Sequence, residues 1–167
     1  MSTLQEAVTE YRKQMERGVV ETAYRGLIEY VTSLKNDFGK AHPDLAPGNI
    51  YQGYMDMTYF PLFPKALTSR KLKIAVVLVH KTVSFEVWLS AQNRQVQAEY
   101  RRLLEESRWH KYHMPPAGKG VDSILEHTLA EEPDFDDLYG LTRTIEKGTM
   151  GFIGEVEGWL EGQSTKH

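Results

Sequence analysis

Two carboxylates, Asp56 and Glu86, lie in segments where apolar or aromatic residues alternate with polar ones, which is typical of β-strands. In an extended chain Tyr54 would share the face of Asp56, and Trp88 that of Glu86. Carboxylates that meet on one sheet face can hold a divalent ion or share a proton. Beside aromatic rings they also suit a small polar ligand or a peptide. We therefore take Tyr54, Asp56, Glu86 and Trp88, with Arg94 at the rim, as candidate ligand-binding residues.

The same alternation has a simpler explanation, because one face of an antiparallel sheet is commonly solvated. The chain has no cysteine, which excludes a thiol nucleophile and thiolate metal sites. Its six histidines show neither zinc spacing nor a Ser-His-Asp pattern. The expected element order resembles the PD-(D/E)xK nuclease core, but the relevant triplet, Glu86-Val87-Trp88, lacks the lysine. We expect a module that binds a small polar ligand or a protein partner and has no catalytic activity, metal or cofactor. The alternative is a metal-dependent hydrolase or metal chaperone using Asp56 and Glu86.

Three β-type segments that follow one another closely must position these residues. The patterns predict strands at about 51–60, 72–79 and 83–89, and the short connection between the last two predicts an antiparallel hairpin. A short aromatic segment at 109–114 is predicted as a fourth strand. The fold class is therefore α+β, with an antiparallel meander of three to four strands packed against N- and C-terminal helices.

The helices are indicated by capping patterns and by apolar residues at helical spacing. Thr3-Leu-Gln-Glu6 is a capping-box pattern, and Gly18 is a suitable helix end. The first helix would carry an apolar stripe of Leu4, Ala7, Val8, Tyr11 and Met15. A second helix is predicted from about residue 20 to residue 38. Ser123-Ile-Leu-Glu126 is another capping-box pattern and predicts a helix there, and the last helix is expected at about 138–160.

The last helix contains glycines at short, regular spacing. They are Gly148, Gly151, Gly154 and Gly158. Each costs about 1 kcal/mol relative to alanine in a helix interior. Close packing against a neighbouring element or against a second copy of the chain would offset that cost, and in the second case the chain would form a homodimer through the C-terminal helix. A weak or broken helix is the other explanation.

Composition places the chain among globular proteins, with 41% hydrophobic and 26% charged residues among 167. We expect one domain over residues 1–161 and a disordered tail at 162–167. No apolar segment approaches the ~20 residues that span a bilayer, and no signal peptide is visible, so we expect a cytoplasmic protein without membrane contact. A basic centre, 61–112, precedes an acidic end, 113–167. These charges either bind an anion or neutralise each other, and their density does not indicate nucleic-acid binding.

A family resemblance rests on short motifs spread over the chain. They are Tyr51-Gln-Gly-Tyr-Met-Asp-Met-Thr-Tyr-Phe60, Leu72-Lys-Ile74, Phe85-Glu-Val-Trp-Leu89, Asn93-Arg94 and Lys119-Gly-Val-Asp122. Through these the chain resembles an uncharacterised bacterial family, domain of unknown function 7000, which implies no activity. In element order it is also similar to YdhG-like domains, some of which are described as frataxin-like iron chaperones. That likeness would direct attention to Asp56 and Glu86, although the chain lacks an acidic first helix.

Overall fold

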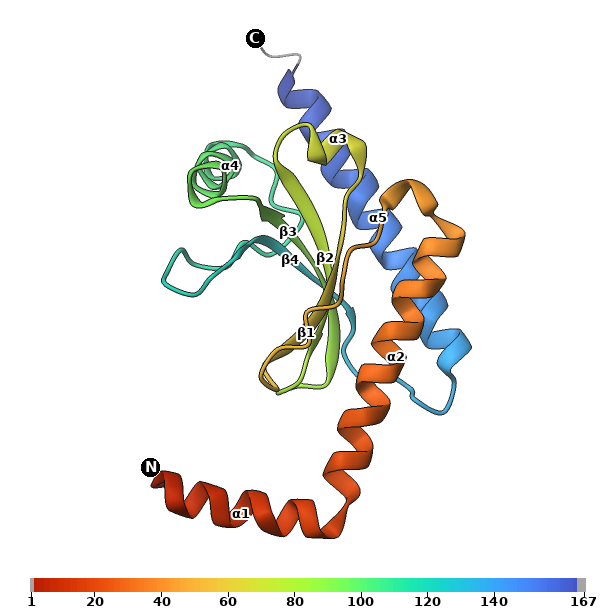
Figure 1. Ribbon diagram of the computed structural model, residues 1–167. Helices are drawn as coiled ribbons and strands as arrows, with labels where there is room; N and C mark the ends of the chain where they lie inside the picture. Colours follow the sequence, from red (N-terminus) through yellow and green to blue (C-terminus); the bar gives the residue numbers. More distant parts are fainter. Residues whose placement is uncertain (1, 165–167) are drawn as a thin grey trace.

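A four-stranded antiparallel sheet with helices on both faces forms the centre of the molecule (Figure 1). The computed structural model describes residues 2–164. Its elements are α1 (Leu4–Arg17), α2 (Val19–Ala41), η1 (Pro43–Leu45), β1 (Met57–Leu62), α3 (Lys65–Thr68), β2 (Leu72–Val79), β3 (Ser84–Ala91), α4 (Arg94–Glu106), β4 (Ser123–Ala130) and α5 (Leu138–Ser164). The strands lie in the order β1-β2-β3-β4, so the predicted α+β meander is confirmed.

One face of the sheet is covered by α2 and α5, which lie side by side (Figure 1). The core sits between these helices and the strands, because alternate residues of each strand are apolar and point toward them. Phe60 and Val87 are buried on the sheet side, and Phe38 and Phe152 on the helix side. Burial of such side chains contributes about 1.5–3 kcal/mol each. This face therefore supplies most of the stability.

The opposite face of the sheet is covered only at one end, by α4 (Figure 1). The strand register places Tyr59, Val77, Glu86 and Thr128 in one row across the sheet. Since Val76 and Val87, their neighbours along the strands, point into the helix-covered core, this row faces the other way. We call this second surface the α4 face.

The first strand begins later than predicted. The expected strand at 51–60 is observed at Met57–Leu62, because Gly53 and Met55 have φ angles of 77° and 64° and turn the chain before β1. A Cβ at Gly53 would lie 2.0 Å from the Met57 carbonyl oxygen, so glycine is required at that turn. Tyr51 forms an isolated bridge to Tyr59 of β1, and the Asp56 carbonyl accepts a 3.0 Å hydrogen bond from the amide of His80.

Pro61, which directly follows the predicted strand at 51–60, lies inside β1. Its position opposite Ala75 leaves the missing N–H on the outer edge of β1, where no ladder bond is lost. Its carbonyl accepts a 2.9 Å hydrogen bond from the amide of Gly48. The segment before β1 therefore covers this edge of the sheet.

The predicted fourth strand at 109–114 is wrong, because β4 is Ser123–Ala130. The capping pattern of Ser123 and Glu126 does not begin a helix. Instead Ser123 Oγ donates a 2.6 Å hydrogen bond to Glu126 Oε1 within the strand, and the backbone of this segment pairs with β3. Pairing along a whole neighbouring strand outweighs a local capping preference.

Residues 109–114 form a loop against α5 and the outer edge of β4. Trp109 stacks on Trp159 with ring centroids 5.5 Å apart, and Tyr112 lies 4.7 Å from Phe152. Of the predicted strand, one bridge from His113 to β4 is present. The alternation of the aromatic residues at 109–114 suggested a strand. Their packing partners, however, lie on the helix α5.

The predicted helix signals at the N-terminus are confirmed. Thr3 and Glu6 form the reciprocal capping box, and Gly18 ends α1 in the left-handed conformation with φ 74°. None of the residues of α1 is buried, and the helix extends away from the sheet (Figure 1). Among the described residues no helix is both long enough and apolar enough to cross a membrane.

The last helix, predicted at 138–160, continues unbroken to Ser164. Residues 162–164 of the predicted tail are thus helical, and 165–167 lie outside the described residues. A Cβ at Gly148 would lie 2.6 Å from Leu129 of β4, so this glycine permits close packing on the sheet. The other three predicted packing glycines face open space, and a homodimer through them stays a prediction.

Candidate functional site

A cavity of about 300 Å³ lies between the α4 face of the sheet and the beginning of α4. This is the lower end of the range for small-molecule sites. Its walls combine strand residues with the turn that enters α4 and one residue before β4. The lining residues are Met57, Tyr59, Lys73, Ala75, Trp88, Ser90, Ala91, Gln92, Asn93, Arg94, Gln97 and Asp122.

The sheet side of the cavity joins aromatic surface to one cation. Tyr59 of β1 and Trp88 of β3 lie on the α4 face, on either side of β2. Lys73 of β2 lies opposite Ser90 in the register and is half-buried on the same face. Within the part of the chain that the structure describes, the ammonium group of Lys73 forms no ion pair. The cavity lining therefore combines a positive charge with two aromatic rings.

The helix side of the cavity holds polar groups in place. Asn93 caps α4 by accepting a 2.9 Å hydrogen bond from the amide of Val96. Gln97 Nε2 donates a 2.9 Å bond to the carbonyl of Val121, which ties the segment before β4 to α4. Arg94 lies 3.9 Å from Asp122, and both side chains are mostly exposed. Because such an exposed pair contributes little, Arg94 is free to turn toward a ligand.

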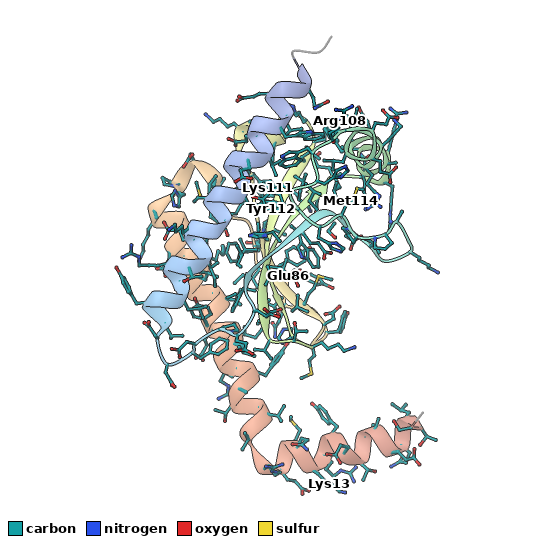
Figure 2. All side chains as sticks on the ribbon, turned by 180° about the vertical axis from the view of Figure 1, so that it is seen from behind. Lys13, Glu86, Arg108, Lys111, Tyr112 and Met114 are labelled. Atoms are coloured by element: carbon teal, nitrogen blue, oxygen red, sulfur yellow. The ribbon has the colours of Figure 1, made fainter. Side chains whose placement is uncertain are left out.

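Glu86 lies on the α4 face next to the cavity, in the middle of the sheet (Figure 2). Trp88 Nε1 donates a 3.2 Å hydrogen bond to Glu86 Oε1, which orients the indole. Burial raises the pKa of the Glu86 carboxyl, and the charge of Glu126 adds to this effect. The hydrogen bond from Trp88 and the charge of His113 act in the opposite direction. Glu86 therefore supports the cavity wall and does not line the cavity.

Asp56 lies at the end of the sheet, outside the cavity. Its Oδ1 accepts a 2.9 Å hydrogen bond from the amide of Tyr54, which lowers the pKa of the Asp56 carboxyl. A smaller lowering comes from His80, whose ring contacts the Thr58 hydroxyl at 2.7 Å. Thr58 pairs opposite Leu78, a core residue, so this group lies toward the helix-covered face. Asp56 thus stabilises the turn before β1.

A family model described as domain of unknown function (DUF7000) matches residues 4–160. The chain belongs to the DUF7000 family. No curated protein matches the chain significantly, and neither does any solved structure. The likeness to YdhG-like domains is not shown by these comparisons and stays a prediction.

The predicted site residues of this DUF7000 chain are only partly brought together. Trp88 and Arg94 line the cavity, and Glu86 lies directly behind Trp88. Asp56 and Glu86 do not share a pocket, and Tyr54, 89% exposed, lies on the turn before β1. Over the described residues there is no group of three or more His, Asp or Glu side chains that could hold a metal ion. The metal-binding alternative therefore lacks the geometry on which it depended.

Sequence reasoning missed Lys73, Tyr59 and Asp122 as cavity residues. The sequence pattern could have pointed to Lys73 as a site residue, because it is a charged residue inside an otherwise apolar strand. Tyr59 was expected to face away from the site, on the side of Tyr51 and Met57. Its true neighbours depend on the register of β1 with β2, which the turn before β1 determines.

Proposed function

We propose that the protein binds a small anionic ligand with a planar, apolar body in the cavity beside Trp88. The observation that carries the proposal is Lys73, an ammonium group without an ion pair among the described residues, in a concave site whose lining also includes the aromatic side chains of Tyr59 and Trp88. Cavities of this kind bury the apolar part of a ligand while a few polar groups orient it. Arg94 at the rim supplies a second cation.

The charge of the cavity favours an anion over a cation. Lys73 and Arg94 contribute two positive charges to its lining, against one carboxylate, Asp122, which is 70% exposed. The indole of Trp88 is held by its bond to Glu86, so its ring is available for stacking without loss of conformational freedom. A carboxylate on a flat ring satisfies both features, with the carboxylate at Lys73 and the ring against Trp88.

Three probes of one shape and different charge test this proposal. Benzoate, benzamide and benzamidine share a planar ring and carry negative, zero and positive charge. We expect the unfolding temperature to rise with benzoate concentration, less with benzamide, and not with benzamidine, because a ligand that binds only the folded state stabilises it by mass action. Calorimetric titration of benzoate gives the affinity.

The matched variants are Lys73→Met and Lys81→Met. Loss of a hydrogen bond to a charged group costs about 1.5–3 kcal/mol, so Lys73→Met should weaken benzoate binding at least about tenfold. Lys81 lies exposed in the turn between β2 and β3, and its variant should bind as the parent does. Asp56→Ala should also leave binding unchanged. Stabilisation by benzamidine, or unchanged binding in Lys73→Met, would contradict the proposal.

A binding role in the cytoplasm remains part of this proposal, as does the absence of catalysis. A hydrolase or metal chaperone that uses Asp56 and Glu86 would need the two carboxylates to meet, and they lie at separate places in the sheet.

A further inference from the structure

The hydroxyl group of Ser90 is buried and has no partner within residues 2–164. Ser90 lies near the end of β3, is only 6% exposed and lines the cavity beside Trp88. Its hydroxyl forms no hydrogen bond with the described part of the chain. Among the described residues, unpartnered side-chain atoms that are fully sealed from solvent occur at Thr149 and Trp159, and Ser90 is not one of them. The Ser90 hydroxyl is therefore open to the cavity, where a ligand can supply the partner that buried hydroxyl groups normally have.

Lys73 lies directly opposite Ser90 where β2 pairs with β3. Residues in this position have Cβ atoms about 4.5–5.5 Å apart and point to the same face of the sheet. The ammonium group of Lys73 likewise forms no hydrogen bond or ion pair within residues 2–164, and it lines the same cavity. This cross-strand pair thus presents a cation and a hydroxyl group to the cavity, and the described chain satisfies neither.

The first turn of α4 brings backbone donors to the same cavity. The chain passes from β3 into α4 through two residues (Figure 1), and Asn93 and Arg94 both line the cavity. The side chain of Asn93 accepts the amide of Val96. The amides of Arg94 and Gln95 have no partner among the described residues. Unpaired amides and the helix dipole make such an N-terminus favourable for an anion, and here it lies beside the Lys73–Ser90 pair.

The donors around the cavity come from two strands and a helix end, and they outnumber the oxygens of a carboxylate. A phosphate monoester has three terminal acceptor oxygens and nearly two negative charges at neutral pH. We propose, on the basis of the function proposed above, that the anionic group of the ligand is a phosphate monoester bound between the Lys73–Ser90 pair and the N-terminus of α4. The planar ring of the ligand packs against Trp88. The ligand class is thereby narrowed to aromatic phosphate monoesters.

The carboxylates near the cavity oppose a dianion only weakly. The side chain of Asp122 is 70% exposed, so water and salt screen its charge, and it lies 3.9 Å from the guanidinium group of Arg94. Glu86 does not line the cavity, and its carboxyl group accepts the indole N–H of Trp88. The two cations of the lining, Lys73 and Arg94, match the two charges of a phosphate monoester.

Three anions that share a phenyl ring separate the shape of the anionic group from its charge. Benzoate is a planar monoanion, phenyl sulfate is a tetrahedral monoanion, and phenyl phosphate is a tetrahedral dianion at about pH 8, well above its second pKa. Calorimetric titration of the full-length protein should give a dissociation constant for phenyl phosphate at least about tenfold below the other two. Inorganic phosphate should bind more weakly than phenyl phosphate, because it lacks the ring. Binding of phenyl phosphate no tighter than that of benzoate would overturn the phosphate assignment.

Ser90→Ala and Ser84→Ala are matched variants on one strand. Both serines are 6% exposed, but Ser84 lies at the other end of β3, where its hydroxyl is 2.7 Å from that of Thr82. Ser90→Ala should weaken phenyl phosphate binding at least about tenfold, whereas Ser84→Ala should bind as the parent does. Because the Ser90 hydroxyl has no partner in the described chain, Ser90→Ala should keep the unfolding temperature of the unliganded parent. Unchanged binding in Ser90→Ala contradicts the proposed contact.

Arg94→Pro, compared with Arg94→Ala, tests the helix N-terminus. Both variants lose the guanidinium group, and only proline also removes the amide. Proline is favoured at the first helical position, and Asn93 before it has the extended backbone that proline requires, with φ −150° and ψ 170°. Phenyl phosphate should bind Arg94→Pro at least about threefold more weakly than Arg94→Ala. Equal affinities would remove the N-terminus of α4 from the site.

The phosphate assignment and the proposed function can fail separately. Benzoate binding that depends on Lys73, together with phenyl phosphate binding that is no tighter, would overturn the phosphate assignment and leave the proposed function standing. If neither benzoate nor phenyl phosphate binds, both are wrong. Tight binding of phenyl phosphate that is lost in Lys73→Met and weakened in Ser90→Ala supports both.

Discussion

Glu86 is a carboxyl group held in a partly buried position next to a ring that it orients. The indole N–H of Trp88 stabilises the ionised form, but burial and the nearby Glu126 outweigh it and raise the pKa of Glu86. A carboxyl whose pKa is higher in the folded than in the unfolded chain contributes stability below the unfolded pKa. That contribution is lost as the pH rises through the folded pKa.

Glu86→Gln should therefore become more stable relative to the parent as the pH rises above about 4.5, the ordinary pKa of this group. Glutamine keeps an acceptor for Trp88 and cannot ionise, so it lacks the loss that the parent suffers. Urea unfolding of both proteins over a series of pH values measures the difference. A difference that does not change with pH would contradict the assigned shift.

Glu155→Gln is the opposite control. Lys111 Nζ and the Tyr112 hydroxyl, which lie against α5 in Figure 2, donate to the Glu155 carboxylate at 2.6 Å and 3.1 Å and lower its pKa. Burial and this carboxylate raise the pKa of Tyr112 to about 12. Here the stabilisation is present above the unfolded pKa and is lost as the pH falls. Glu155→Gln should be less stable than the parent near neutrality, and the two should converge in acid.

Among the elements, α5 contains glycines in two different environments. Gly158→Ala should raise the free energy of unfolding by up to about 1 kcal/mol, because a Cβ there meets nothing within 4 Å and alanine favours the helix. In Gly148→Ala the gain should be smaller or negative, since the Cβ would meet Leu129 at 2.6 Å. Urea unfolding of the two variants tests this contrast. An equal rise in the free energy of unfolding would mean that β4 does not pack against Gly148.

A strand could be predicted from sequence where the length and pattern of the segment fitted a strand and not a helix. The apolar segment 72–79 is long enough for a strand and too short for most helices, and it was found at the observed bounds of β2. The segment 123–130 has a capping pattern and apolar residues that fit a helix as well as a strand, so only its pairing with β3 decides. The segment 109–114 has alternating aromatic residues whose partners lie on α5.

The part of the candidate site that lies on one strand and the helix after it could be predicted from sequence, because no pairing between strands had to be assumed. Glu86, Trp88 and Arg94 follow one another through β3 into α4, and the structure keeps them together. Asp56 was joined to them by an assumed register, and a shift of one residue exchanges the faces of a strand. The turn at Gly53, which determines where β1 begins, depends on a contact with the Met57 backbone that no local pattern reveals.

At the scale of the molecule, α1 is separate from the packing that stabilises the rest. Its residues are all outside the core, which lies between the sheet and the helices α2 and α5. A chain that begins at Gly18 should therefore unfold at nearly the same temperature as the full-length protein. Calorimetry of both chains measures this, and a large loss of stability on shortening would refute the division.

The spatial order of the strands equals their order along the chain, which has a consequence for how the molecule folds. Strand pairs closed by short loops form early, because the entropy lost on closing a loop increases with its length. The β2–β3 hairpin has the shortest connection, whereas β4 must wait for α4 and the loop after it to be placed. During that interval the segment 123–130 is unpaired, and its capping pattern favours transient helix. A helix this short melts within about a microsecond, so the long connection that β4 must close, and not the helix, makes its docking the last pairing step.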